Sequence, residues 1–130
     1  MNLAEYFEKT SGFGVLATSD KQGRVDAAVY ARPHVIDEKT VAFIMRQRVT
    51  HHNLRSNPHA AYLFREGHEG YHGKRLYLQM IREESNQTLI AELSRHEKHI
   101  SPPGDDSQKY LVYFEIQQIR PLIGDEMIDE

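Results

Sequence analysis

The sequence predicts a mainly β, α+β domain in which six antiparallel strands form a small barrel with short flanking helices. Six segments of strand length show continuous or alternating apolar patterns, and turn-forming residues bound them. Most of these segments are joined by tight turns, which connect antiparallel neighbours. Closure into a barrel would remove the exposed edges of so small a sheet.

The first expected element is a short amphipathic helix, whose apolar residues recur at helical spacing and stop at Ser11-Gly12. The apolar segment 13–19 then forms a strand. Residues 20–23 (DKQG) form a hairpin turn with glycine where a positive φ is required. Segment 24–33 is the second strand, with an apolar face and a more polar face.

The middle of the chain is expected to form strand, short helix and strand. Segment 40–46 is apolar on both faces, as in a strand buried on both sides in a barrel or at a subunit interface. A short helix is expected over 51–57 with Thr50 as its N-cap. Pro58 ends this helix because proline disfavours helical geometry in the residue before it. Strand 59–66 follows.

The last part of the chain is expected to contain a glycine-rich loop, two strands and a helix. Loop 67–73 leads into strand 74–84. Asn86 caps a helix over 87–99, whose apolar residues form one stripe. Strand 110–120 is the final element.

One domain is expected over residues 1–120, followed by an acidic tail over 121–130 that is mobile or docked on a partner. Cysteine is absent, so nothing indicates an oxidising compartment, and the cytoplasm is the expected location. The 16 basic and 19 acidic residues are interleaved, and a net charge of -3 provides no footprint for nucleic acid. No apolar run is long enough to predict a membrane span.

Several chemistries are disfavoured by what the motifs lack. No G-x-G-x-x-G follows a predicted strand, and there is no G-x-S-x-G, so a dinucleotide-binding fold and a serine hydrolase are not expected. His68 and His72 have the spacing of a helical metal pair, but the surrounding glycines indicate a loop, so no metal site is expected. His96 and His99 are expected near a helix C-terminus, where histidine complements the dipole.

Four stretches in the first half of the chain carry a resemblance to a known family: Gly14–Ser19, Gly23, Val41–Ile44, and Asn53–Pro58 followed by an apolar strand. In this order they resemble the pyridoxamine 5'-phosphate oxidase-like FMN-binding split-barrel family. The resemblance is weak beyond residue 78. It implies a six-stranded antiparallel split β-barrel and a homodimer that holds FMN in a groove between its subunits.

The resemblance also implies where FMN is held. Its phosphate would be met just before the helix that ends at Pro58, where Arg48 and Thr50 contribute basic and hydroxyl groups and His51 or His52 adds a donor. A helix N-terminus suits this task because it offers unpaired N–H groups and partial positive charge. The family usually has a hydroxyl residue followed by two basic residues, so the order differs here. The other implied flavin contacts are Tyr30, Ala31, Arg32, Phe43, Ile44 and Arg75.

The implied activity is redox chemistry performed by FMN itself, with the protein supplying position and electrostatics. No catalytic acid or base is assigned. Authentic pyridoxamine 5'-phosphate oxidase is not expected, because that enzyme has a longer, tryptophan-containing C-terminal section and this chain has no tryptophan. A small flavin-dependent oxidoreductase with an unknown small-molecule substrate is therefore expected. Two alternatives stay open: a haem-binding or haem-degrading split-barrel protein, and a non-catalytic dimeric binding module.

Overall fold

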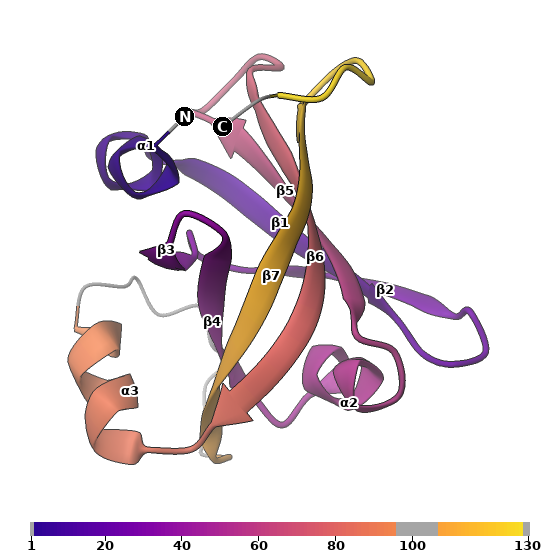
Figure 1. The fold of residues 1–130 in the computed structure, drawn as a ribbon, viewed down its shortest axis with the longest axis vertical. Helices are drawn as coiled ribbons and strands as arrows, with labels where there is room; N and C mark the ends of the chain where they lie inside the picture. Colours follow the sequence, from indigo (N-terminus) through magenta and orange to yellow (C-terminus); the bar gives the residue numbers. More distant parts are fainter. Residues whose placement is uncertain (1, 96–106, 129–130) are drawn as a thin grey trace.

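The computed structural model describes residues 2–95 and 107–128, and these residues form seven strands and three helices (Figure 1). The elements are α1 (Leu3–Lys9), β1 (Gly12–Ser19), β2 (Val25–Val29), β3 (His34–Asp37), β4 (Thr40–Arg46), α2 (Val49–Ser56), β5 (His59–Glu66), β6 (Gly73–Glu84), α3 (Gln87–Ser94) and β7 (Lys109–Pro121). The strands form one sheet in the order β2-β1-β5-β6-β7-β4-β3, and its neighbouring strands are antiparallel. The mainly β, antiparallel prediction is confirmed.

The predicted number of six strands is wrong, because residues 34–37, which lie in none of the predicted strands, form the additional strand β3. β2 stops at Val29, and β3 begins at His34 at the other end of the sheet order. Proline cannot donate to a strand ladder, so Pro33 is unsuited to continue the strand. The described strands therefore leave the sheet open between β2 and β3, and the expected closure of the barrel does not occur.

The main core lies inside the curved sheet and is rich in aromatic rings. Phe43 of β4 packs against Tyr62 of β5 and Phe114 of β7, with ring centroids 5.0 and 5.8 Å away. Phe7 of α1 contacts Phe64 edge-to-face at 5.2 Å. α1 thus closes one end of the core with an apolar side chain.

The burial of β4 on both faces has a structural reason within the described chain. Phe43 faces the main core, while Ala42 belongs to a second cluster with Ile90 of α3 and Leu111 of β7. Ile44 packs against this second cluster. The second buried face of β4 is therefore covered by α3, and no subunit interface is needed to explain it.

The two predicted helix caps have different outcomes. The Asn86 side chain accepts a hydrogen bond of 3.1 Å from the Leu89 N–H, so the predicted cap of α3 is confirmed. Thr50 is not the N-cap of α2: the cap is Arg48, and the helix begins at Val49. Thr50 lies in the first turn with its side chain 3% exposed, turned inward rather than back along the helix. The predicted end of the helix over 87–99, with His96 and His99, lies outside the described residues.

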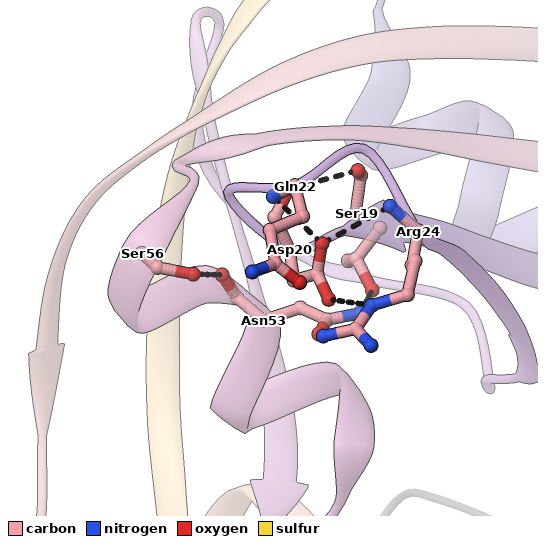
Figure 2. Close-up of polar contacts among 7 residues, drawn as sticks. Ser19, Asp20, Gln22, Arg24, Asn53 and Ser56 are labelled. Atoms are coloured by element: carbon pink, nitrogen blue, oxygen red, sulfur yellow. Dashed lines mark hydrogen bonds and ion pairs between the residues drawn. The ribbon is translucent and has the colours of Figure 1, made fainter.

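α2 is held against β1 by a buried side-chain hydrogen bond. The Asn53 Nδ2 donates to the Thr18 Oγ1 at 3.1 Å, and both residues are buried. Figure 2 shows the β1–β2 turn beside this helix. There the Asp20 carboxylate accepts hydrogen bonds from the Arg24 N–H at 3.0 Å and the Arg24 Nε at 2.8 Å (Figure 2). The turn and the helix are thereby ordered next to each other.

The described part of the C-terminal tail packs on its own chain. The Ile128 N–H donates to the Ile119 carbonyl of β7 at 2.8 Å. The Arg75 side chain donates to the carbonyls of Pro121 and Gly124, and the Arg120 side chain donates to the Asp125 carbonyl. Through these contacts residues 124–128 pack against β6 and β7.

Candidate functional site

Four of the predicted FMN contacts lie at the start of α2: Tyr30, Arg48, Thr50 and His51. Tyr30 follows the end of β2, and its side chain hydrogen-bonds that of Thr50 in the first turn of the helix. Arg48, the N-cap residue, is exposed and close enough to act electrostatically on the Tyr30 hydroxyl. Phe43 lies against Tyr30, with the two rings edge-to-face and their centroids 5.8 Å apart. The chain thus assembles a hydroxyl pair and a guanidinium at one helix end.

The electrostatics of this helix end favour an anion. Burial raises the pKa of Tyr30, while the Thr50 hydrogen bond and the Arg48 charge oppose that rise, so the phenol stays neutral at physiological pH. The first turn of α2 contains no acidic residue, and Arg48 makes no side-chain capping bond to it. Helix N–H groups without a side-chain cap and a nearby arginine are the groups that bind a phosphate.

His51 occupies a buried position in the same turn, where it joins α2 to the sheet. The residue is 2% exposed, and its Nε2 lies 2.8 Å from the Glu83 Oε1 of β6. The ring also stacks on Tyr110 of β7, with centroids 4.4 Å apart and planes 11° from parallel. One of the two nitrogens that a histidine can offer a phosphate is therefore engaged by Glu83. His52 is exposed.

Ala31 and Arg32 lie next to Tyr30, and both contact other parts of the fold. The Ala31 carbonyl accepts a hydrogen bond of 3.1 Å from the Tyr62 hydroxyl. The Arg32 Nη1 donates to the carbonyls of Phe7 at 2.6 Å and Thr10 at 2.9 Å. Arg32 therefore holds the C-terminal end of α1, where unpaired carbonyls attract a cation.

The remaining predicted contacts are not gathered at the start of α2. Phe43 is 2% exposed and part of the core, and Ile44 points to the opposite face of β4, against α3. Arg75 of β6 binds the tail through the Pro121 carbonyl at 3.0 Å and lies 3.4 Å from the Asp125 carboxylate. Their assignment as FMN contacts stays a prediction that the single chain does not bring to one place.

Sequence reasoning missed a cleft of about 820 Å³ beside segment 30–35. Phe13 and Arg65 line it, together with the predicted residues Tyr30, Ala31 and Arg32. Gly14 also lines the cleft, and a Cβ there would lie 2.0 Å from the Tyr62 hydroxyl, so only glycine leaves room for the Tyr62 side chain. The two glycines of the GFG stretch were the available clue, because glycine inside a strand often marks a close backbone approach.

A buried lysine was also missed. Lys74 of β6 is 9% exposed, and its Nζ lies 4.5 Å from the centre of the Tyr6 ring. The Tyr6 hydroxyl donates to the Glu66 carboxylate at 2.5 Å. Burial lowers the pKa of Lys74, and Glu66 partly opposes this shift. Burial also raises the pKa of Tyr6, and the hydrogen bond to Glu66 adds to that rise.

Comparison with known proteins shows what fold the chain has. No family model and no curated protein sequence matches it. Among solved structures, an FMN-binding protein from Syntrophomonas wolfei subsp. wolfei is 15% identical, with a TM-score of 0.73 over 95% of this chain and 85% of that one. An F420 reductase is 16% identical, with a TM-score of 0.66 over 92% and 98%. A candidate pyridoxamine 5'-phosphate oxidase of Listeria innocua is 17% identical, with a TM-score of 0.62 over 93% and 98%.

The chain has the pyridoxamine 5'-phosphate oxidase-like split-barrel fold. The open sheet between β2 and β3 belongs to this split barrel, and the resemblance found in the first half of the sequence is confirmed at the level of the fold. Within residues 2–95 and 107–128, none of the helices has the length and apolar character needed to cross a membrane. In the same described ranges, no three histidine, aspartate or glutamate side chains are gathered closely enough to hold a metal ion.

Proposed function

We propose that this split-barrel protein is a cytoplasmic flavoprotein that binds FMN noncovalently and acts, as a homodimer, as a small flavin-dependent oxidoreductase. The proposal joins the fold, which it shares with an FMN-binding protein and an F420 reductase, to the chemistry of one helix end. Its substrate is a small molecule whose class the helix end does not specify.

The observation that carries the proposal is the start of α2. No side chain of the N-cap residue caps the first-turn N–H groups of this helix, and that residue, Arg48, is exposed and brings a positive charge to the same helix end. At the other helices an asparagine caps the first turn, Asn2 at α1 and Asn86 at α3. A phosphate at α2 would complete the missing cap and pair with the arginine. The residues present therefore fit the phosphate end of FMN.

In this proposal FMN supplies the redox chemistry when it is bound. Arg48 and the first turn of α2 bind the phosphate, and Thr50 orients the neutral Tyr30 hydroxyl through their hydrogen bond. His51 positions the helix, because its contacts to Glu83 and Tyr110 fix the first turn against β6 and β7. Asn53 adds a second attachment to β1. A rigid helix end lowers the entropy lost when a ligand binds.

The proposed homodimer has an available surface on the outer face of the sheet. Val15 of β1 pairs with Val29 of β2 and Leu63 of β5, so these side chains share one face. Val29 and Leu63 are 43% and 40% exposed. Along the same face, Ala17 pairs with Ala27 and Ala61, which keeps the surface flat. A contiguous apolar surface of this kind suits a second copy of the chain.

The first test is the absorption and fluorescence of the purified chain before and after FMN is added, with haem as the comparison ligand. Flavin bands and quenched flavin fluorescence are expected. A Soret band with haem and no FMN binding would replace the proposal with the haem-binding alternative. Binding of neither ligand would leave the dimeric binding module as the better description.

A further inference from the structure

The cleft beside segment 30–35 has the size of a small-molecule site and lies outside the predicted phosphate site. Its volume of about 820 Å³ is within the range of roughly 300 to 1,000 Å³ that such sites occupy. β2 pairs with β1 from Ser19 to Val15, so the first residues of β1 border the cleft instead of continuing that ladder. Arg48, Thr50 and His51 do not line it.

The two arginines of the cleft are bound very differently. Arg32 is engaged by two carbonyls at the end of α1, at 2.6 and 2.9 Å. Arg65 makes a longer bond of 3.3 Å to the His68 carbonyl. The Arg65 Nε is buried and has no hydrogen-bond partner among the described residues. The Nε is too buried for a ligand to reach, so the terminal nitrogens of the guanidinium, of which Nη2 makes only the 3.3 Å bond, are the donors that an added acceptor can contact.

The lining of the cleft is more apolar than polar. The Arg65 guanidinium lies over the Phe13 ring, with its Cζ 5.9 Å from the ring centre, and Phe13 is 45% exposed. Phe7 and Val35 supply further apolar wall from α1 and β3. Glu8 is the one carboxylate among the lining residues, against two arginines. The cleft thus combines an apolar lining with an excess of positive charge.

We infer that this cleft binds a small organic carboxylate with an apolar body, whose carboxylate meets the Arg65 side chain and whose body lies against Phe13 and Phe7. Arginine binds a carboxylate through parallel N–H bonds, while the aromatic walls remove the apolar part from water. Arg48, Thr50 and His51, which are assigned to the FMN phosphate, take no part. Tyr30, Ala31 and Arg32, which are implied flavin contacts, also line the cleft, so competition with FMN belongs to the test.

The test uses sodium octanoate and octan-1-ol as matched probes, which share the apolar chain and differ in the charged group. The ¹⁵N-labelled full-length chain is titrated with each probe, and the amide shifts of Gly12, Gly14 and Gly67 report on the cleft. Octanoate is expected to shift these amides and to bind about tenfold more tightly than octanol, as one charge-assisted contact implies. Arg65→Gln is expected to abolish that preference, and Arg65→Lys to retain part of it.

The matched control is Arg55→Gln, an exposed arginine of α2 whose loss leaves the octanoate preference unchanged. Equal affinity for octanol and octanoate, or an unchanged preference in Arg65→Gln with native amide spectra, would overturn the inference. It would also be overturned if Arg65→Gln converted a dimer to monomers without changing octanoate binding, since Arg65 would then serve a second copy. Displacement of octanoate by saturating FMN would assign the cleft to the flavin site instead.

Discussion

Several residues of this split barrel that the sequence predicts as cofactor contacts make structural contacts within the chain. Arg32 holds the end of α1, Arg75 holds the tail, and His51 is engaged by Glu83. Arg48 is the N-cap residue of α2, whose first turn contains no acidic residue. Of the predicted basic contacts, Arg48 is therefore the one on which the proposed phosphate site depends most.

The double variant Arg48→Ala plus Thr50→Ala is expected to weaken FMN binding by roughly 2 kcal/mol or more, because charge-assisted bonds to the phosphate are lost. Fluorescence titration of FMN measures the change. Arg55→Ala, an exposed arginine later on the same helix, is the control and is expected to bind FMN as the wild type does. Equal affinities in the double variant and the wild type would refute the phosphate assignment.

Lys74 is expected to make the free energy of unfolding depend on pH in the alkaline range. Burial lowers its pKa below the ordinary 10.5, so the folded chain binds fewer protons than the unfolded chain between these two pKa values. The free energy of unfolding therefore rises with pH in that interval, because the folded chain holds Lys74 in its neutral form more readily than the unfolded chain does. Relative to Lys74→Met, the wild type should gain stability between about pH 7 and about pH 10. Urea unfolding at both pH values measures this, and a constant difference would contradict it.

At the scale of elements, the proposed function depends on how tertiary contacts orient α2 more than on the helix propensity of its residues. The helix has eight residues, too few to be stable alone in water. Asn53 ties it to β1, and His51 ties it to β6 and β7. The N-terminal end that is proposed to bind phosphate is therefore oriented by tertiary contacts from three strands.

Asn53→Ala is expected to destabilise the fold by about 1–3 kcal/mol, since it leaves the buried Thr18 hydroxyl without its partner. Ser56→Ala on the same helix is the control. Its exposed hydroxyl makes only a 3.3 Å bond to the Asn53 carbonyl, so a change within about 0.5 kcal/mol is expected. Chemical denaturation measures both variants, and equal effects would show that the buried hydrogen bond does not hold α2.

At the scale of the whole molecule, the three described helices leave the outer face of β2, β1 and β5 uncovered, while α3 covers the same side of the sheet at β4 and β7. α1 packs on β3, α3 packs on β7, and α2 lies at the inner side of β1, where Thr18 meets Asn53. The outer face of β2, β1 and β5 stays exposed with its valine, alanine and leucine side chains. This is the surface that the proposed homodimer would bury.

Leu63→Glu is expected to convert the dimer to monomers, because it places a charge in the middle of the proposed interface. Light scattering coupled to size-exclusion chromatography measures the mass of each form. Ile36→Glu, at an exposed apolar position of the edge strand β3, is the control and should remain dimeric. A monomeric wild type, or a dimeric Leu63→Glu variant, would disprove the proposed interface.

The sequence by itself determined the elements whose patterns are local. The alternation of apolar residues predicts the long strands, and Asn86 and Pro58 mark one helix start and one helix end, because capping and proline geometry act within a few residues. The order of motifs in the first half was sufficient to predict the split-barrel fold. The same local patterns also place Arg48 and Thr50 at the start of α2.

Only the tertiary structure decided how these parts meet. The Tyr62 hydroxyl of β5 donates to the Ala31 carbonyl between β2 and β3, and the Thr50 side chain is hydrogen-bonded to that of Tyr30, a residue 20 positions earlier. The cleft at Arg65 joins residues from α1, β1, β3 and β5. Contacts between residues distant in sequence form only when the chain folds, so no local pattern contains them.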